Sequence, residues 1–326
     1  MAAQPLMTPP EAAAGFLAAA GWGDAAILPL AGDASFRRYF RAVAPGRSAV
    51  LMDAPPQHED CRPFLAVAAH LAGLGFAAPR VLATDLAQGL VLLEDFGDRR
   101  MAEAIAAAAV DEVETYAAAI DLLGALHRHP AGPLPPYDMA VYLREARLFP
   151  EWYLPALGLP EPPGHDAAWA EALAPIAADR SVTVLRDYHA ENIMLLDGGA
   201  LGLLDFQDAL AGHPAYDLVS LLQDARRDVA PSLEAAMLAR YAAVAGRAID
   251  PAAYALLGAQ RNAKILGIFT RLWKRDGKPR YLAYQPRVWA YLERDLAHPA
   301  LAPVKAWFDA AVPPELRAAH WREAVA

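Results

Sequence analysis

The chain has 326 residues, long enough for two lobes with separate cores, since single hydrophobic cores stop growing near roughly 250 to 300 residues. Hydrophobic residues make up 56% and charged residues 21%, a composition too apolar for intrinsic disorder and too often interrupted by charge for a polytopic membrane protein. Lysine and arginine total 29 against 38 acidic residues, and the resulting net charge of -9 excludes an overall basic surface for nucleic acid.

Cysteine usage and the amino-terminal segment indicate a cytoplasmic protein. Cys61 is the only cysteine, so the chain can form neither an intrachain disulfide nor a metal site built from several cysteines. The first residues contain no basic segment followed by an apolar stretch, and the uncharged run 12–23 is shorter than the roughly 20 residues of a membrane span. We therefore expect neither secretion nor membrane insertion, and we expect a monomer.

The first 95 residues show mostly strand-like patterns. An alanine-rich helix is expected near residues 11–22. The segments AILPLAG, SFRRYFRAV and SAVLMDA then read as three strands separated by Gly, Asp and Pro, which favours an antiparallel meander. The segment CRPFLAVAAHLAGLG has helical spacing and ends in glycine, and PRVLATD and GLVLLED read as two further strands.

From Arg99 onward the patterns are mainly helical, as in DEVETYAAAIDLLGALHRH, except for a strand-rich island at residues 182–205. We therefore predict an α+β fold with a small antiparallel-sheet lobe, residues 1–95, and a larger, mainly helical lobe, residues 96–326. Residues 94–98 would form the connector.

The island TVLRDYHAENIMLLDGGALGLLDFQDA carries polar side chains at the ends of its apolar strands. A hairpin closed by the two glycines would bring Asn192 to the same end of the sheet as Asp205, and Asp187 lies in the preceding loop. Such oxygen groups suit Mg²⁺ carrying the phosphates of a nucleotide, with two of them holding the metal and the third positioning an acceptor hydroxyl. Asp and Asn also favour turns for conformational reasons alone, but the hairpin spacing and the upstream sheet favour a phosphoryl-transfer site.

The segments LRDYHAEN and LLDFQD resemble the aminoglycoside phosphotransferase branch of the protein-kinase-like fold, whose catalytic loop has Asp, four residues, then Asn, followed by a metal-binding Asp. The resemblance implies that ATP is the phosphoryl donor. It also implies that Asp187 contacts the acceptor and acts as catalytic base or hydroxyl orienter, and that Asn192 and Asp205 bind Mg²⁺.

A narrower resemblance rests on GDASFRRYFR, VLMDAPP, LLEDFGD, LRDYHAENIM and LDFQDALAGHPAYDLVSLLQDARRDV. Together these segments resemble the N-acetylmuramate/N-acetylglucosamine anomeric kinases of cell-wall recycling over most of residues 28–275. The resemblance implies ATP-dependent phosphorylation of the anomeric hydroxyl of these amino sugars, giving a sugar 1-phosphate. Two alternatives remain: a kinase of the same fold for an aminoglycoside, choline-like or homoserine acceptor, and a catalytically inactive nucleotide-binding module.

The sheet lobe has no lysine to pair with phosphates as the third-strand lysine of protein kinases does. All four lysines lie in the carboxyl-terminal part of the chain: Lys264, Lys274, Lys278 and Lys305. An arginine must substitute, or the nucleotide binds differently. The candidates are Arg37, Arg38 and Arg41, although each could instead be a solvated strand residue. Strand alternation would place Arg37 and Arg41 on one face, and the turn GDAS, with Ser35, could cap the phosphates with backbone N–H groups.

Near the connector, the family resemblance implies that backbone groups of Leu93, Glu94 and Asp95 bond the adenine. Glu59, just ahead of a helix, could orient a phosphate-binding arginine, but a solvated charge is the favoured interpretation.

The acceptor sugar is expected near YLREARLFPEWYL, where Glu145 could bond hydroxyls. The aromatic residues of this segment could cover a sugar face or pack in the core: Phe149, Trp152 and Tyr153. The lactyl carboxylate of N-acetylmuramate requires a cation, and the candidates are Arg144, Arg261 and Lys264. Plain surface charge is an alternative for each of these three.

Four further residues have structural interpretations. Asp217 should cap a helix or anchor loop N–H groups. For His189, a hydrogen-bonded scaffold role in the catalytic loop is favoured over proton transfer. His127 and His129 are best explained as a solvated helix end.

Overall fold

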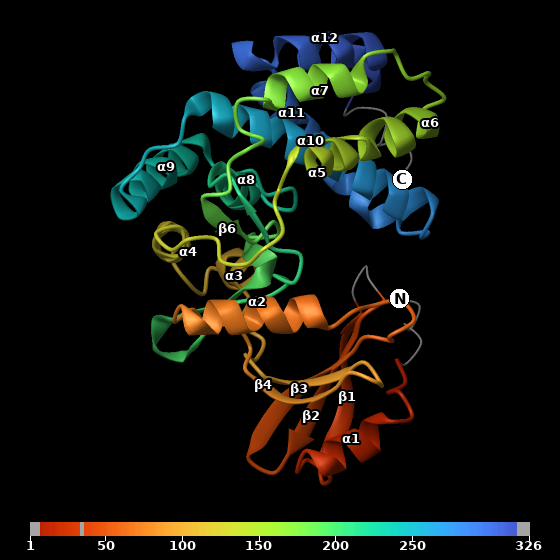
Figure 1. Cartoon of the computed structure of the whole chain (residues 1–326), viewed down its shortest axis with the longest axis vertical. Helices are drawn as coiled ribbons and strands as arrows, with labels where there is room; N and C mark the ends of the chain where they lie inside the picture. Colours follow the sequence, from red (N-terminus) through yellow and green to blue (C-terminus); the bar gives the residue numbers. More distant parts are fainter. Residues whose placement is uncertain (1–6, 33–35, 318–326) are drawn as a thin grey trace. The chain divides into compact units, whose positions relative to one another are not determined.

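The computed structural model describes residues 7–32 and 36–317. The chain divides into two compact units, which are treated separately below (Figure 1). The sheet unit comprises residues 1–107 and 191–208, and the helical unit comprises residues 108–190 and 209–326.

The sheet unit is built on five antiparallel strands in the order β1-β2-β3-β5-β4, so the expected meander is confirmed for its first three strands. Its strands are β1 Ala26–Gly32, β2 Arg38–Ala44, β3 Arg47–Asp53, β4 Val81–Asp85 and β5 Leu90–Glu94. Its α-helices are α1 Ala13–Ala19, α2 Arg62–Gly73 and α3 Met101–Ala106.

One face of this sheet packs on α1. Phe40 and Leu51, from neighbouring strands, are fully buried with Leu17 of the helix, which follows from the alternation of side chains along β2 and β3. The helix α2 buries Phe64 among other apolar residues, and the Phe64 ring stacks on that of Phe206, with centroids 5.1 Å apart. This contact fixes the segment that follows the hairpin of the sequence island.

The hairpin forms as expected, with β7 Ile193–Leu195 antiparallel to β8 Leu201–Leu203. It belongs to the sheet unit: the Leu203 amide donates to the carbonyl of Ala77, and the Leu195 amide to that of Arg99, both at 2.8 Å. The expected division at residue 95 separated the hairpin and α3 from the sheet. These contacts instead join the hairpin and α3 to the sheet unit. The order of the elements along the chain did not indicate this, because the hydrogen bonds connect segments about 100 residues apart.

The helical unit follows the expectation of a mainly helical second part. Its α-helices are α4 Glu112–Leu126, α5 Met139–Ala146, α6 Leu154–Ala156, α7 His165–Leu173, α8 Ala215–Leu222, α9 Pro231–Ala245, α10 Pro251–Lys274, α11 Gln285–Leu296 and α12 Ala302–Ala311. A π-helical turn, η1 Phe149–Tyr153, follows α5, and the short strands β6 Val182–Val184 and β9 Leu210–Gly212 pair antiparallel. The 3₁₀ turns in the described part of the chain are η2 Ala190–Asn192, η3 Asp197–Gly199, η4 Pro279–Tyr284, η5 Pro299–Leu301 and η6 Pro314–Leu316.

The long helix α10 is central to this unit: sixteen of its 24 residues are buried, and it packs on α5, α8, α11 and η1. An interior helix of this kind can present polar side chains to buried partners only if each is hydrogen-bonded. Arg261, Asn262 and Lys264 lie on it, and their partners are described below.

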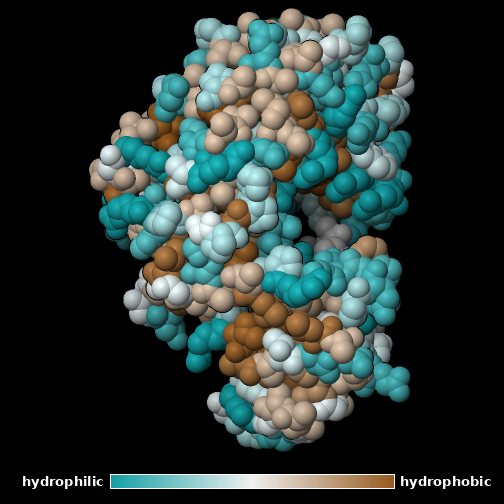
Figure 2. Space-filling model, viewed as in Figure 1, coloured by the Kyte–Doolittle hydropathy of each residue, from teal (hydrophilic) through white to brown (hydrophobic). Residues whose placement is uncertain are grey.

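On the surface, exposed large apolar side chains of the sheet unit include Leu28, Val81 and Leu82, and Figure 2 shows a brown, hydrophobic area on this unit among hydrophilic ones. Within residues 7–32 and 36–317, no helix has both the length and the apolar character needed to cross a membrane.

Candidate functional site

Asn192 and Asp205 meet at the open end of the β7–β8 hairpin. The backbone amide of Leu204 donates to the Asn192 carbonyl at 3.0 Å, and Nδ2 of Asn192 lies 3.4 Å from Oδ2 of Asp205. The second oxygen of Asp205 accepts from Nε2 of Gln207 at 2.8 Å. The glycine turn, at Gly198 and Gly199 with φ of 76° and 84°, therefore produces the juxtaposition that the sequence predicts for this pair.

The backbone is strained beside the predicted catalytic residues. Among the described residues other than glycine, positive φ occurs at Ala108, Arg186 and Asp205, with 71° at Arg186 and 57° at Asp205. Such conformations are uncommon for these residue types and concentrate at functional sites. Arg186 directly precedes Asp187, so two of the three positions flank or form the predicted site.

The oxygens at the hairpin end fit a metal ion that arrives with a nucleotide. In the described part of the chain, no group of three or more His, Cys, Asp or Glu side chains could hold a metal by itself. Mg²⁺ is commonly bound through one or two carboxylates, with phosphates and water completing its octahedron. The carboxylate of Asp205 and the amide oxygen of Asn192 match that donor set.

Asp187 lies in a loop of the helical unit, and the side chain of Asp217 anchors the backbone of this loop through hydrogen bonds. Oδ2 and Oδ1 of Asp217, a fully buried residue at the start of α8, accept from the amides of Leu185 at 2.6 Å and Arg186 at 2.8 Å. Burial raises the pKa of Asp217 to about 7, and the two N–H donors oppose this shift. Asp217 therefore holds the backbone immediately before Asp187.

Cations surround the Asp187 carboxylate. Its side chain is 41% exposed, and NH2 of Arg261 lies 3.8 Å from Oδ1. Partial burial raises the pKa of Asp187, but the charges of Lys264 and Arg261 outweigh it, so the pKa is lowered overall. Asp187 is therefore ionised at neutral pH and suited to accept a hydrogen bond from a hydroxyl.

Glu145 lies beside this site but its carboxylate is occupied by the protein. It accepts from the hydroxyl of Tyr137 and from NH2 of Arg186, and Nζ of Lys264 lies 3.0 Å from Oε1. Burial raises the pKa of Glu145, yet Lys264 and Arg186 lower it more strongly, to about 2. We expected Glu145 to bond sugar hydroxyls, but this geometry gives it the role of holding two cations.

The role of Arg186 was missed in the sequence. Its position just before Asp187 was the available signal, but its partner Glu145 lies 41 residues away and no local pattern connects the two.

The aromatic residues near Glu145 divide between core and surface. Phe149 and Tyr153 are fully buried and stack with centroids 4.6 Å apart, and Nε1 of Trp289 donates to the Tyr153 hydroxyl at 2.7 Å. They belong to the core, which excludes them from covering a sugar, whereas Trp152 is half-buried. Arg144 is exposed on α5 and forms no ion pair with a described residue.

Two of the three arginines considered for phosphate binding are engaged elsewhere in the sheet unit. Arg38 pairs with the buried Asp53, to which Nε donates at 2.8 Å. Arg41 pairs with Asp95 at 2.8 Å and Asp98 at 2.8 Å, which ties β2 to the connector.

Arg37 differs from these two arginines. Its Nε lies 3.8 Å from Oε2 of Glu59, and the carboxylates of Asp205 and Asp208 are among the charges that raise its pKa against the effect of burial. Arg37 therefore lies in the field of a predicted metal ligand. Glu59 is paired rather than solvated, which corrects the favoured expectation.

The remaining nucleotide candidates are only partly placed. Ser35 lies outside the described residues. Leu93 and Glu94 form the end of β5, where Leu93 is paired with both β3 and β4 and the Glu94 amide donates to the carbonyl of Arg80 at 2.9 Å. The amide of Glu94 is therefore already used within the sheet, and in the connector the Gly97 amide donates to Oδ1 of Asp95 at 2.9 Å.

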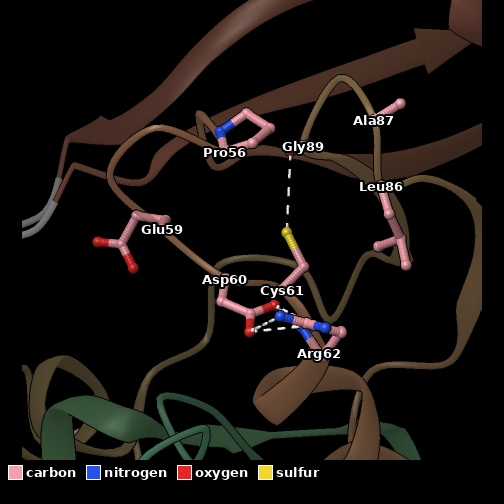
Figure 3. A pocket seen from close by; sticks show the side chains of 8 residues that line it. All are labelled: Pro56, Glu59, Asp60, Cys61, Arg62, Leu86, Ala87 and Gly89. Carbon is pink, nitrogen blue, oxygen red and sulfur yellow. Dashed lines mark hydrogen bonds and ion pairs between the residues drawn. The ribbon is translucent and has the colours of Figure 1, made fainter.

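A pocket of about 400 Å³ opens in the sheet unit where the loop before α2 faces the β4–β5 turn (Figure 3). Its lining residues are Pro56, Glu59, Asp60, Cys61, Arg62, Leu86, Ala87 and Gly89. Asp60 pairs with Arg62 in its wall, and burial raises the pKa of the Cys61 thiol. The described nucleotide candidates do not line this pocket, and Glu59 connects it to Arg37.

Two histidines of the helical unit, His127 and His189, are buried beside polar partners. His127 is buried, with Nδ1 2.8 Å from the Tyr241 hydroxyl, and burial lowers its pKa to about 3. The expectation of a solvated helix end is therefore wrong for His127, because α9 covers it. His189 is buried in the catalytic loop, where Nε2 lies 3.4 Å from NH1 of Arg226 and burial lowers the pKa to about 4.

Comparison with known proteins places the chain in a family. The family model described as "Phosphotransferase enzyme family" matches residues 26–257. An N-acetylmuramate/N-acetylglucosamine kinase of Caulobacter vibrioides is 42% identical over 94% of this chain and 97% of that protein. A kinase of the same name from Pseudomonas aeruginosa is 43% identical over 87% of this chain and 89% of that protein.

Solved structures support the kinase-like fold. Choline kinase LicA of Streptococcus pneumoniae matches with a TM-score of 0.60 at 13% identity, over 85% of this chain and 93% of that one. ADP-bound aminoglycoside phosphotransferase APH(2'')-Ib matches with a TM-score of 0.59 at 16% identity, over 87% and 97%. At these identities the likeness concerns the fold, and it confirms the kinase-like fold that the sequence predicts. The chain therefore belongs to the phosphotransferase enzyme family, together with the N-acetylmuramate/N-acetylglucosamine kinases that it resembles.

Proposed function

We propose that this protein is an ATP-dependent cytoplasmic kinase that phosphorylates the anomeric hydroxyl of N-acetylmuramate and N-acetylglucosamine, giving the sugar 1-phosphates in peptidoglycan recycling. Relatives of that name align over most of the chain at 42% and 43% identity. The observation that carries the chemistry is the approach of Asn192 to Asp205 at the end of one hairpin, five and eighteen residues after the anchored Asp187.

Asp187 orients the sugar hydroxyl for in-line attack on the terminal phosphate of ATP, and its lowered pKa keeps it an acceptor of hydrogen bonds. Asn192 and Asp205 would hold Mg²⁺, which would neutralise phosphate charge when bound with ATP. Catalysis comes from positioning and charge stabilisation, so no phosphoenzyme is expected.

Arg37 is the arginine that we propose for the phosphates. Arg38 and Arg41 are each held by carboxylates of the sheet and connector, whereas Arg37 is held by Glu59 and lies in the field of Asp205. An arginine that pairs with Glu59 and is subject to the charge of a predicted metal ligand can contact phosphate oxygens bound to that metal. Arg37 would thus replace the lysine that the sheet unit lacks.

Phosphorus NMR of the product tests the proposal. Purified protein with ATP, Mg²⁺ and either amino sugar should yield a new resonance coupled to the anomeric proton, which identifies a 1-phosphate. A resonance coupled to another ring position, or turnover only with choline, homoserine or an aminoglycoside, would replace the proposed reaction with another kinase activity of this fold. ATP binding without turnover on any acceptor would indicate an inactive nucleotide-binding module.

A further inference from the structure

Three cations of the helical unit gather beside Asp187: Arg186, Arg261 and Lys264. Two of them share the buried carboxylate of Glu145, and Arg261 lies 3.8 Å from Asp187. Asp217, the next carboxylate, uses both oxygens for backbone N–H groups of the same loop. The cluster thus contains three positively charged groups but only two carboxylates to pair with them, those of Glu145 and Asp187. The carboxylate of a ligand would supply a third negative partner.

The three cations differ in side-chain type and in their partners within the protein. Arg261 has a side chain only 6% exposed, and its NH2 donates to Oγ of Ser220 at 2.7 Å. Arg186 is fixed by its left-handed backbone and by the ion pair with Glu145, and its guanidinium lies over the Tyr137 ring. These two therefore belong to the framework of the loop.

Lys264 differs from the two arginines in having a flexible side chain without a planar fork of donors. Its ammonium group lies 3.0 Å from Oε1 of Glu145 and 3.3 Å from the Tyr216 hydroxyl, the second at the long end of the hydrogen-bond range. An ammonium has three donors on a flexible four-carbon stem. Lys264 can therefore turn one donor from Tyr216 to a ligand while the bond to Glu145 persists.

Lys264 also lies close to where the acceptor must bind. Among the charges that lower the pKa of Asp187, that of Lys264 has the largest effect. The hydroxyl that meets Asp187 is on the anomeric carbon, and the lactyl ether of N-acetylmuramate is on the ring carbon in 1,3 relation to it. N-acetylglucosamine has a hydroxyl there and no carboxylate.

We propose that Lys264 is a specificity-determining residue that binds the carboxylate of an acidic amino sugar, and that Glu145 positions it for this contact. The inference rests on the proposed function, because it places the acceptor hydroxyl at Asp187. In this proposal, the ammonium group of Lys264 determines how strongly the protein prefers an acidic over a neutral amino sugar.

The test compares kcat/KM for N-acetylmuramate and N-acetylglucosamine in Lys264→Met and Lys264→Gln. The ratio of the two values should fall about tenfold or more in both variants, since a charge-assisted hydrogen bond is lost for one acceptor only. Lys264→Arg keeps the charge and should retain a larger ratio than the neutral variants. Lys305→Met is the matched control: Lys305 is half-exposed and pairs with Asp309 on α12, so its removal should leave the ratio unchanged.

Titration calorimetry with each sugar separates this inference from the proposed function. Suppose that wild-type protein binds N-acetylmuramate but turns over neither sugar, and that this binding weakens in the neutral Lys264 variants. That result would support the inference and refute the function. If the ratio of kcat/KM values is unchanged in the Lys264 variants, or if both sugars lose affinity equally, the inference is overturned. Turnover of the amino sugars by the wild-type protein would still support the proposed function. Wild-type protein that binds neither sugar would overturn both. Gln can still bond Glu145, so Lys264→Gln provides the test if Lys264→Met does not fold.

Discussion

Asn192 and Asp205 approach each other to 3.4 Å between Nδ2 and Oδ2 although thirteen residues separate them along the chain. The register of the hairpin causes this, because Ile193 pairs with Leu203 and the next residues outward lie at the same edge. The backbone ladder of the hairpin thus places a carboxylate and a side-chain amide at one edge, where Asp205 accepts from the amide groups of Asn192 and Gln207. Changing one member of the pair tests its role in metal binding.

Asp205→Asn should lower turnover by about a hundredfold or more and raise the Mg²⁺ concentration needed for half-maximal rate. The amide keeps the shape of the side chain and the contact with Gln207 but removes the charge that a hard cation requires. Initial rates across a magnesium titration at fixed ATP measure both effects.

Asp197→Asn is the matched control, because Asp197 is exposed at the opposite, turn end of the same hairpin. It should behave as wild type. An Asp205→Asn protein with an unaltered magnesium requirement would remove Asp205 from the metal site.

Asp187→Asn should reduce kcat by about 10² to 10⁴ while KM for ATP changes little, since the hydroxyl orienter is lost and the nucleotide ligands remain. Asn keeps the side-chain volume, and the Asp217 anchor acts on the preceding amides. Steady-state kinetics and calorimetry with a non-hydrolysable ATP analogue give the two values. Asp228→Asn, at an exposed ion pair with Arg287, is the control, and undiminished kcat in Asp187→Asn would reject the assigned role.

Arg37→Met should raise KM for ATP about tenfold, and Arg37→Lys should be intermediate because it keeps the charge but loses the planar fork. Glu59→Gln should have a smaller effect in the same direction, since it loosens Arg37 without removing it. Arg47→Met serves as control, because Arg47 is half-exposed and pairs with Asp24. Equal KM values for Arg37→Met and Arg47→Met would exclude Arg37 from the phosphate site.

Local signals explain why part of this site could be predicted from the sequence. The two glycines between apolar runs specify the hairpin, and the hairpin specifies which end carries Asn192 and Asp205. The meander of the first three strands followed in the same way from short turns.

The remaining features depend on partners far apart in the sequence. From the sequence, Glu145 is a polar residue on an amphipathic helix, but its charge is satisfied internally by Arg186 and Lys264, which lie 41 and 119 residues later in the chain. Likewise, the burial of His127 depends on Tyr241 of α9, 114 residues away. Burial of a charged or polar group follows from packing, which a single sequence does not reveal.

A buried carboxylate away from the site predicts an unusual pH dependence of stability. Asp295 of α11 accepts from Nε2 of Gln223 at 3.1 Å and Nδ2 of Asn262 at 3.2 Å, and α10 approaches it so closely that a Cβ on Gly258 would lie 2.3 Å from Oδ2. Burial raises the pKa of Asp295 to about 7, despite the nearby charge of Arg294 and these two donors.

Because the folded pKa of Asp295 is raised, the folded state binds its proton more tightly than the unfolded chain does, and the free energy of unfolding decreases as pH rises from about 4 to about 7. The decrease should be at most roughly 4 kcal/mol from this residue, and in Asp295→Asn it should be absent. Urea unfolding of both proteins at several pH values between 4.5 and 8 measures it, and the difference between them cancels the same-direction contribution of Asp217. Parallel curves for the two proteins would show that Asp295 does not titrate in this range.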